Sequence, residues 1–523
     1  MAAADSGKGK TAAMARGAGL AFLGRAGAVI EVFTFFLFTQ MYGSETFGLF
    51  MTLWGLAQVL SIISDFGMTM ALQRFVPAED DERGAGRVLK YAFYTALTIS
   101  CVMAGALVLA APWLADVINA NERDSQHLVT IIQVYAIAIP LWCLIDVATA
   151  AIRARSIFGP EVRVRVFYEQ GFRLMFGSLF WYLGAVTMGL FISHLIGLAV
   201  TLVFALRLLH KYYGLHHLFA RTGMGKGLGR QMMSFSSSMM LPNLAKKWHS
   251  WLPVLFLNIM LPGARGAEAA GVYSAARKLV SVLNIFRESF EYVLAPMASA
   301  QKADKDRGHL QEMYAFATRM SVAAFIPTAT LIICYRDELL RQSGSEFVAG
   351  AAAMLVLALG RSVEVTMGPS TSILAMIGAY RLPLINAVAG VLTTAICAYI
   401  LVPQPELFGG GLAGSMVGAA IAAAAGINVT ALLGHLQVRF IYNLQPFDLR
   451  MVRPVVVSLL VGAVLAGLYT ATQDIWRTGY FLLGITTLLL ALMAIIRLGM
   501  TAEDARLIVP RALGKRFPFL IQR

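Results

Sequence analysis

The sequence predicts an all-α polytopic membrane protein with about fourteen transmembrane helices. Of its 523 residues, 58% are hydrophobic and 14% are charged, and the mean hydropathy is +0.68. A soluble domain is nearer to roughly 45–50% apolar and about 25% charged. The apolar residues also come in long blocks separated by short charged stretches, which is typical of helices that cross a bilayer. These observations exclude an ordinary soluble enzyme.

Hydropathy places the predicted helices in order along the chain. The spans are residues 18–40, 47–72, 88–111, 127–152, 162–185, 187–209, 231–260, 270–298, 313–334, 346–378, 382–403, 411–436, 454–471 and 478–499. The first apolar run is too long for the core of a signal peptide, so we expect this helix to stay attached. All predicted external connections are short, which leaves no room for a folded external domain.

Basic residues predict how these helices are oriented. The formal net charge is +14, from 43 Lys and Arg against 29 Asp and Glu. Basic residues of membrane proteins concentrate in cytoplasmic connections, and here most of those outside the spans fall on one side. The exceptions are Arg123, Arg265, Arg336, Arg341 and Arg477. We therefore expect both termini to lie in the cytoplasm.

The predicted helices form two lobes of six, in a pseudo-twofold arrangement, plus two C-terminal helices. Residues 1–209 make the N-lobe (helices 1–6), and residues 231–436 make the C-lobe (helices 7–12). Residues 210–230 form a basic, glycine-rich cytoplasmic linker between them. Residues 437–523 hold helices 13 and 14 and a cytoplasmic tail.

A weak internal repeat supports this division. The second helix begins Phe47-Gly48-Leu49-Phe50 and the eighth begins Ala270-Gly271-Val272-Tyr273, an offset of 223 residues. In the same register Gln58 matches Ser281, Ser61 matches Asn284, and Asp65 matches Glu288. Both helices begin outside, so the lobes would be parallel repeats about an axis along the membrane normal, as in transporters that rock about a central site.

Two neighbouring helices carry polar faces within the membrane. On the eighth helix a face about 80° wide is polar over four turns. Its residues are Tyr273, Arg277, Ser281, Asn284, Glu288 and Glu291. On the seventh helix the polar residues share an arc of about 100°. They are Ser236, Asn243, Lys246, Lys247 and Ser250.

A charge at mid-bilayer costs roughly 2.5–3.5 kcal/mol, so it is expected to face a partner or a water-filled cavity. Internal ion pairs at helical spacing are favoured for Glu169 with Arg173 and for Arg361 with Glu364. No acid at helical spacing pairs all the other embedded bases, so we expect a cationic cavity for an anion. Its predicted binding residues are Arg25, Lys246, Lys247, Arg277, Lys278, Asn243 and Asn284.

Embedded acids are candidates for coupling transport to a proton or sodium ion. These candidates are Glu31, Asp65, Glu288 and Glu291. We expect no other cofactor and no metal site, because the four cysteines lie far apart and no metal-binding histidine motif occurs. We find no catalytic constellation. The acidic cluster at residues 79–82 is typical of a solvated loop.

Three segments carry a resemblance to a known family. They are Phe47-Gly48-Leu49-Phe50 through Asp65-Phe66-Gly67-Met68 to Gln73-Arg74-Phe75, then Gly271-Val272-Tyr273-Ser274-Ala275-Ala276-Arg277-Lys278-Leu279, and Gly411-Leu412-Ala413-Gly414 to Gly418-Ala419-Ala420. These segments resemble the polysaccharide transporter family, the Wzx-type flippases of the multidrug/oligosaccharidyl-lipid/polysaccharide exporter superfamily. The resemblance extends over most of helices 1–12.

The resemblance implies two six-helix lobes around a central cavity and two peripheral helices. It also implies movement of polyprenyl-pyrophosphate-linked oligosaccharide from the cytoplasmic to the periplasmic leaflet. Related lipid II flippases use basic residues on the first and eighth helices, and the matching positions are Arg25 and either Arg277 or Lys278. The polar stripe favours Arg277 of that pair.

The sequence therefore predicts a transporter, a lipid-linked oligosaccharide flippase that works by alternating access in surface or exopolysaccharide synthesis. Its expected partners are the lipid-linked glycan, the bilayer, and a polysaccharide polymerase with its chain-length machinery, and we expect no nucleic acid. Two alternatives remain open: a cation-coupled antiporter for drugs or small solutes in the same superfamily, and a membrane-embedded polysaccharide polymerase.

Overall fold

The computed structural model describes residues 2–79, 81–155, 157, 163–214, 227–285, 287–288, 307–377, 379, 381–472 and 479–500. Side chains are described within these ranges except those of residues 2–30, 166, 246, 307, 309, 310, 313, 375, 376, 479–483 and 485. The described chain contains helices and no strand. The predicted all-α class is confirmed.

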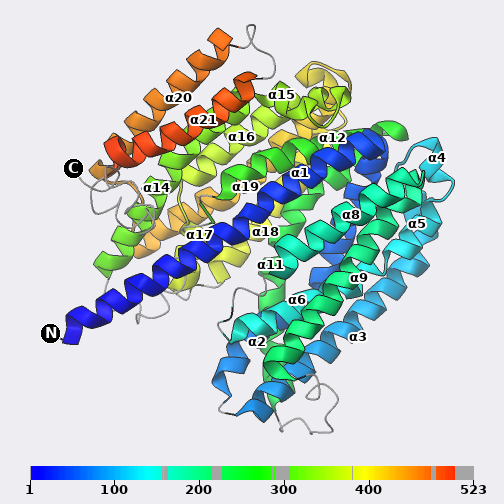
Figure 1. Cartoon of the computed structure of the whole chain (residues 1–523), viewed down its shortest axis with the longest axis horizontal. Coiled ribbons are helices and arrows are strands. Elements are labelled where there is room, and N and C mark those ends of the chain that lie inside the picture. The colour runs from blue at the N-terminus through cyan, green and yellow to red at the C-terminus, as the bar shows by residue number, and fades with distance from the viewer. Residues whose placement is uncertain are drawn as a thin grey trace.

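The N-terminal half is a bundle of long helices (Figure 1). Its elements are α1 (Ala2–Asp65), α2 (Met68–Phe75), η1 (Val76–Ala78), α3 (Glu82–Ala115), α4 (Glu122–Ser125), α5 (Leu128–Tyr135), α6 (Ala138–Ala154), η2 (Arg163–Tyr168), α8 (Glu169–Tyr182) and α9 (Val186–Tyr213). Helix α6 packs against α3 and α9, α8 packs against α9, and α1 contacts all four of these helices.

The C-terminal half repeats this pattern. Its elements are α11 (Leu228–Met260), α12 (Ala264–Val280), η3 (Ser281–Leu283), α14 (Arg307–Cys334), α15 (Arg336–Arg341), η4 (Ser345–Gly350), α16 (Ala351–Thr366), α17 (Ser370–Met376), α18 (Arg381–Leu401), η5 (Pro405–Phe408), α19 (Gly411–Tyr442), η6 (Leu449–Met451), α20 (Val452–Thr472), α21 (Gly479–Ala494) and η7 (Ile495–Gly499). Helices α20 and α21 lie along the edge beside α14 (Figure 1).

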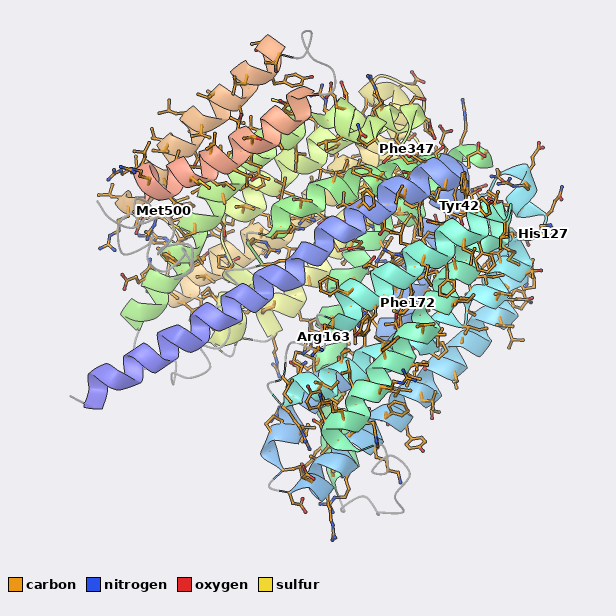
Figure 2. All side chains as sticks on the ribbon, in the orientation of Figure 1. Tyr42, His127, Arg163, Phe172, Phe347 and Met500 are labelled. Carbon is orange, nitrogen blue, oxygen red and sulfur yellow. The ribbon has the colours of Figure 1, made fainter. Side chains whose placement is uncertain are left out.

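Each predicted span overlaps a helix of the structure. Within the described ranges, nine helical stretches are long and apolar enough to cross a membrane. Figure 2 shows side chains over the outside of the bundle. Large apolar side chains such as those of Leu109 and Phe440 are about three-quarters exposed. Such a surface fits lipid contact. The count of fourteen spans and the proposed domain boundaries stay predictions, and most of the linker lies outside the described residues.

The first two predicted spans lie in one continuous helical element, α1, which breaks at Gly43. The backbone of Gly43 is non-helical, with φ 74° and ψ 167°, a conformation that glycine adopts without a Cβ penalty. The chain folds back at Gly43, and two ring contacts across the break show this. The Phe35 ring lies 5.4 Å from the Phe47 ring and 6.2 Å from the Trp54 ring, between centres. We call the end of the bundle with Gly43 and α4 the Gly43 end, and the opposite end the α2 end.

The two halves meet at the Gly43 end through matching glycines of the repeat. A Cβ on Gly48 would lie 1.7 Å from the carbonyl oxygen of Ala267, and one on Gly271 would lie 2.2 Å from that of Ser44. Gly48 and Gly271 are the residues that the 223-residue offset equates. The two copies of the repeat therefore touch at equivalent positions, as residues on a pseudo-twofold axis do.

A clasp of two asparagines also joins the halves at the Gly43 end. The Asn119 backbone N–H donates to Asn258 Oδ1 at 3.0 Å, and Asn258 Nδ2 donates to the Asn119 carbonyl at 2.8 Å. Asn119 Nδ2 donates to the Asn258 carbonyl at 2.8 Å, and Gly263 N donates to Asn119 Oδ1 at 2.8 Å. These bonds tie the chain after α3 to the end of α11.

Candidate functional site

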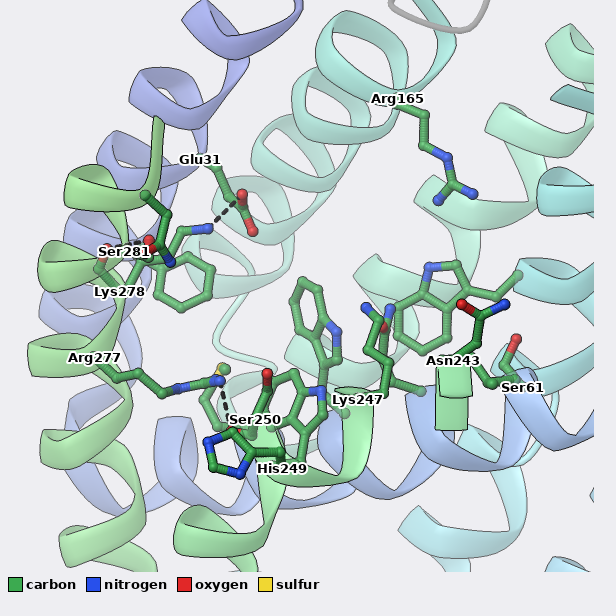
Figure 3. Close-up of a pocket in the computed structure, with 18 of the residues that line it drawn as sticks. Glu31, Ser61, Arg165, Asn243, Lys247, His249, Ser250, Arg277, Lys278 and Ser281 are labelled. Atoms are coloured by element: carbon green, nitrogen blue, oxygen red, sulfur yellow. Dashed lines mark hydrogen bonds and ion pairs between the residues drawn. The ribbon is translucent and has the colours of Figure 1, made fainter. Parts of the chain in front are cut away.

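A cavity of about 900 Å³ lies between the two halves (Figure 3). Its walls come from α1, α6, η2 and α8 of the N-terminal half and from α11, α12, α16 and α19 of the C-terminal half. A volume of this size lies within the range of sites that hold a ligand. Charged and aromatic side chains together make up much of the lining.

Basic side chains gather where α11 and α12 face α1. Lys278 Nζ lies 2.5 Å from Glu31 Oε2, an ion pair that joins α12 to α1. Arg277 donates from its terminal nitrogen to the Ser250 carbonyl at 2.8 Å, and its guanidinium carbon lies 4.4 Å from the centre of the Trp251 ring. Arg277 Nε has no hydrogen-bond partner in the described part of the chain. We call this the cationic end of the cavity.

Lys247 and Arg361 complete the cationic end. Lys247 Nζ donates to Gln58 Oε1 at 2.8 Å, which links α11 to α1. Arg361 pairs with Glu364 at 2.6 Å, as predicted from their spacing, and Arg287 lies 3.3 Å from the same carboxylate. Glu364 is therefore shared by two guanidinium groups. The cation–π and ion-pair contacts hold these bases in place within a low-dielectric wall.

Asp65 lies at the α2 end, where the chain bends between α1 and α2. Its carboxylate accepts from the Thr69 N–H at 3.1 Å and from the Thr69 hydroxyl at 2.8 Å, as a helix cap does. Phe66 and Gly67 have positive φ, 48° and 76°. A Cβ on Gly67 would lie 2.4 Å from the Ser236 carbonyl, so glycine is required for α2 to meet α11.

A second group of charges lines the cavity between α6 and α8. Arg165 forms an ion pair with Asp146, and its other nitrogen lies 3.6 Å from Glu169. The predicted pair of Glu169 with Arg173 is wrong. Arg173 is fully buried, donates to Gln170, and lies 4.7 Å from the Trp54 ring centre. A helical residue has possible partners four residues before it and four residues after it. Glu169 pairs with Arg165, four residues before it, and not with Arg173, four residues after it.

The structure gathers several predicted binding residues around one cavity. Lys247, Arg277, Lys278, Asn243 and Asn284 all line it. The expected choice between Arg277 and Lys278 does not arise, because both line the cavity. The side chains of Arg25 and Lys246 lie outside the described residues.

Among the predicted coupling residues, Glu31 and Asp65 line the cavity. Glu291 lies outside the described residues, and Glu288 is exposed and is not among the lining residues. The predicted stripe assumed 100° per residue throughout. Helix α12 instead changes to a 3₁₀ turn at Ser281–Leu283, which advances about 120° per residue and so rotates the side chains of later residues away from the stripe.

Several residues of α6, η2 and α8 line the cavity without having been predicted as binding residues, chiefly Trp142, Asp146, Thr149, Arg165 and Glu169. A signal was present for α6, because Trp142, Asp146, Thr149 and Arg153 have the same spacing as Trp54, Gln58, Ser61 and Asp65. No cluster of three or more His, Cys, Asp or Glu suited to a metal ion occurs within the part of the chain that the structure describes.

Known proteins are similar to this chain in sequence and in fold. The chain is 22% identical over 430 residues to a probable low-salt glycan biosynthesis flippase, Agl15, of Haloferax volcanii, which covers 80% of this chain and 79% of that protein. It superposes on the lipid II flippase MurJ in an inward closed conformation with TM-score 0.68 and 12% identity, covering 91% and 97% of the two chains.

A MATE-family multidrug resistance transporter of the MOP superfamily, in an inward-facing conformation, superposes with TM-score 0.60 and 14% identity, covering 81% and 99%. The family described as "Polysaccharide biosynthesis protein" matches residues 15–301, more than half of the chain. The chain therefore belongs to the polysaccharide biosynthesis protein family, on a fold that it shares with MOP-superfamily transporters.

Proposed function

We propose that this protein is a flippase for polyprenyl-pyrophosphate-linked oligosaccharide, which it moves from the cytoplasmic to the periplasmic leaflet. The observation that carries the proposal is the cationic end of the cavity, where Lys247, Arg277, Lys278 and Arg361 converge. A pyrophosphate carries about two negative charges, and charge-assisted hydrogen bonds from such groups offset its loss of hydration. The similarity to a glycan biosynthesis flippase and to MurJ supports the same substrate class.

The direction of transport has a physical source. Moving negative charge out of a cell with a negative interior gains roughly 2.3 kcal/mol per charge per 100 mV. We place the protein in the bacterial inner membrane with both termini inside, and we propose that it delivers substrate to a polysaccharide polymerase and its chain-length machinery. The bilayer supplies the path for the polyprenyl tail.

We also propose that transport follows alternating access, with the N-lobe and the C-lobe rocking about the cavity. The close glycine contact and the asparagine clasp both lie at the Gly43 end, which is the periplasmic end in the orientation proposed here. Breaking these contacts while new ones form at the α2 end would expose the cavity to the other side.

Coupling to a proton or sodium ion is proposed at Glu31 and Asp65. Glu31 bridges the two halves through Lys278, so neutralising it would weaken a contact between them. Asp65 sits at a bend that meets α11. An ion that binds either carboxylate in one state only would shift the balance between states.

The test is flipping of a fluorescent lipid-linked glycan in proteoliposomes. Lys247→Ala and Arg277→Ala should each slow flipping about tenfold or more, since a charge-assisted hydrogen bond contributes roughly 1.5–3 kcal/mol. Arg341→Ala, at an exposed arginine away from the cavity, is the control. Normal flipping in both cavity variants, at equal protein incorporation, would reject the proposal.

Drug antiport is the second candidate, favoured by the structural similarity to a multidrug MATE transporter. The cationic end argues against it for cationic drugs, because like charges in a shared cavity repel. Proton- or sodium-driven export of a cationic dye by the reconstituted protein, without glycan flipping, would establish antiport in place of the flippase.

A further inference from the structure

Two helices of the N-terminal half each carry a tryptophan followed by three polar residues at the same spacing. The series on α1 is Trp54, Gln58, Ser61 and Asp65, and the series on α6 is Trp142, Asp146, Thr149 and Arg153. On each helix the four residues fall within an arc of about 60°. All eight line the cavity. We call these two stripes the polar ladder.

The two stripes lie side by side. The Trp54 and Trp142 rings are 5.7 Å apart between centres, and α1 and α6 are in contact. Both helices run from the tryptophans toward the α2 end. The residues of the two helices correspond step by step, because both series have the same spacing. The amide of Gln58 corresponds to the carboxylate of Asp146, and the hydroxyl of Ser61 corresponds to that of Thr149.

Hydrogen-bond acceptors lie along the polar ladder and beside it. Asp65 and Asp146 of the ladder and Glu169 of the neighbouring α8 supply three carboxylates that line the cavity, and Arg153 is the one base of the ladder. Each carboxylate offers about four acceptor positions. Thr69 occupies two of those of Asp65, and Arg165 contacts both Asp146 and Glu169, so capacity remains on all three.

A buried donor at the start of the polar ladder points to a ligand. The Trp142 side chain lines the cavity, is 1% exposed, and its indole N–H has no hydrogen-bond partner within the described residues. Buried N–H groups in folded proteins nearly always have a partner. An oxygen atom of a ligand in the cavity would supply one.

We propose that the polar ladder is the sugar subsite of the cavity, and that it takes an uncharged, hydroxyl-rich saccharide next to the pyrophosphate. This inference rests on the proposed function. Sugar hydroxyls donate to Asp65, Asp146 and Glu169 and accept from the Trp142 N–H. A sugar that carries a carboxylate, such as a uronic acid, is disfavoured because the three carboxylates outnumber the two lining arginines of the N-terminal half, Arg153 and Arg165, and Arg165 is already paired with Asp146 and Glu169.

The test compares three short-chain polyprenyl ligands on the purified full-length protein in nanodiscs. The first carries a bare pyrophosphate, the second a pyrophosphate with N-acetylglucosamine, and the third a pyrophosphate with glucuronic acid. We expect the neutral sugar to tighten binding about tenfold over the bare pyrophosphate, and the glucuronic acid to give no gain.

Two variants connect this gain to the polar ladder. Asp146→Asn keeps the side-chain shape and Trp142→Phe keeps an aromatic ring. Each variant should lose most of the gain in affinity that the neutral sugar gives over bare pyrophosphate, with both ligands measured on the same variant. Glu122→Gln, on the exposed helix α4, is the control.

The outcomes separate the two proposals. Binding of bare pyrophosphate with no gain from the sugar, or equal gains from the neutral and acidic sugars, would overturn the sugar subsite alone. Equal weakening of every ligand by Asp146→Asn and Trp142→Phe would also overturn it. If no ligand binds the unmodified protein, the proposed function fails and the sugar subsite fails with it.

Discussion

The ion pair of Lys278 with Glu31 places a counter-charge beside the proposed pyrophosphate site. The two side chains are about one-quarter exposed or less, so the pair is only partly screened by water. An incoming pyrophosphate would compete with Glu31 for the Lys278 ammonium. Glu31 thus opposes anion binding, while it also holds α1 to α12.

Replacing Glu31 by Gln should therefore have opposite effects on affinity and stability. We expect Glu31→Gln to bind inorganic pyrophosphate severalfold more tightly, because Lys278 loses its competitor, and to lower the melting temperature, because a partly buried cation loses its partner. Calorimetric titration and thermal unfolding measure the two effects. Weaker pyrophosphate binding in Glu31→Gln would show that the ion pair does not compete with the ligand.

Asp65 combines a structural and a proposed functional role, and two substitutions separate them. Asp65→Ala removes the cap on α2 and should cost about 1 kcal/mol of stability, whereas Asp65→Asn keeps an acceptor and should cost less. Reconstituted flipping under imposed proton and sodium gradients then tests coupling. An unchanged ion response in Asp65→Asn would leave Asp65 as a cap alone.

Individual residues show how far sequence reasoning reaches. Helical spacing predicted the Arg361 and Glu364 pair and the cavity position of Arg277, because both depend on local geometry. The partner of Lys278 could not be found in this way, because Glu31 is remote in sequence and the contact depends on how α1 packs against α12. The spacing of the polar ladder was visible in the sequence.

At the scale of the helices, the contact of α1 with α12 depends on two glycines. We expect Gly48→Ala and Gly271→Ala each to destabilise the protein by about 1–3 kcal/mol, because the added Cβ would overlap a carbonyl oxygen. The two glycines touch, so the double variant should cost less than the sum of the single ones.

Thermal unfolding of the purified variants checks this, with Gly105→Ala as the matched control. Gly105 lies within α3, and a Cβ there would meet no atom within 4 Å. The better helix propensity of alanine should leave that variant unchanged or slightly more stable. Equal effects at all three positions would mean that the α1–α12 contact is not close-packed in the protein.

The helices themselves were largely predictable, since each follows a long apolar run. Their interruptions were less so. Gly43 lies between the first two predicted spans, where a break was expected. The 3₁₀ turn at Ser281–Leu283 has no glycine or proline to announce it, and it removed Glu288 from the predicted stripe. Tertiary packing, not local propensity, decides such a turn.

At the scale of the whole molecule, contacts between the two halves determine which side of the cavity is closed. The reciprocal bonds of Asn119 and Asn258 contribute about 0.5–1.5 kcal/mol each, and they act together with the glycine contact at the Gly43 end. Weakening them should shift the population toward a state that is open at that end, because only the closed state contains them.

Labelling of a cavity cysteine measures this shift. In a background with the four native cysteines replaced by alanine, Ser281→Cys places a thiol on the cavity wall. A membrane-impermeant maleimide added from the outside should label it slowly, and severalfold faster when Asn119→Ala and Asn258→Ala are also present. The same clasp variants should leave labelling at an exposed site, Glu122→Cys on α4, unchanged.

If the rate of labelling at Ser281→Cys does not rise, the asparagine clasp fixes local structure without closing the cavity. Closure would then depend on the glycine contact between α1 and α12, where helix backbones meet and no side chain can relax.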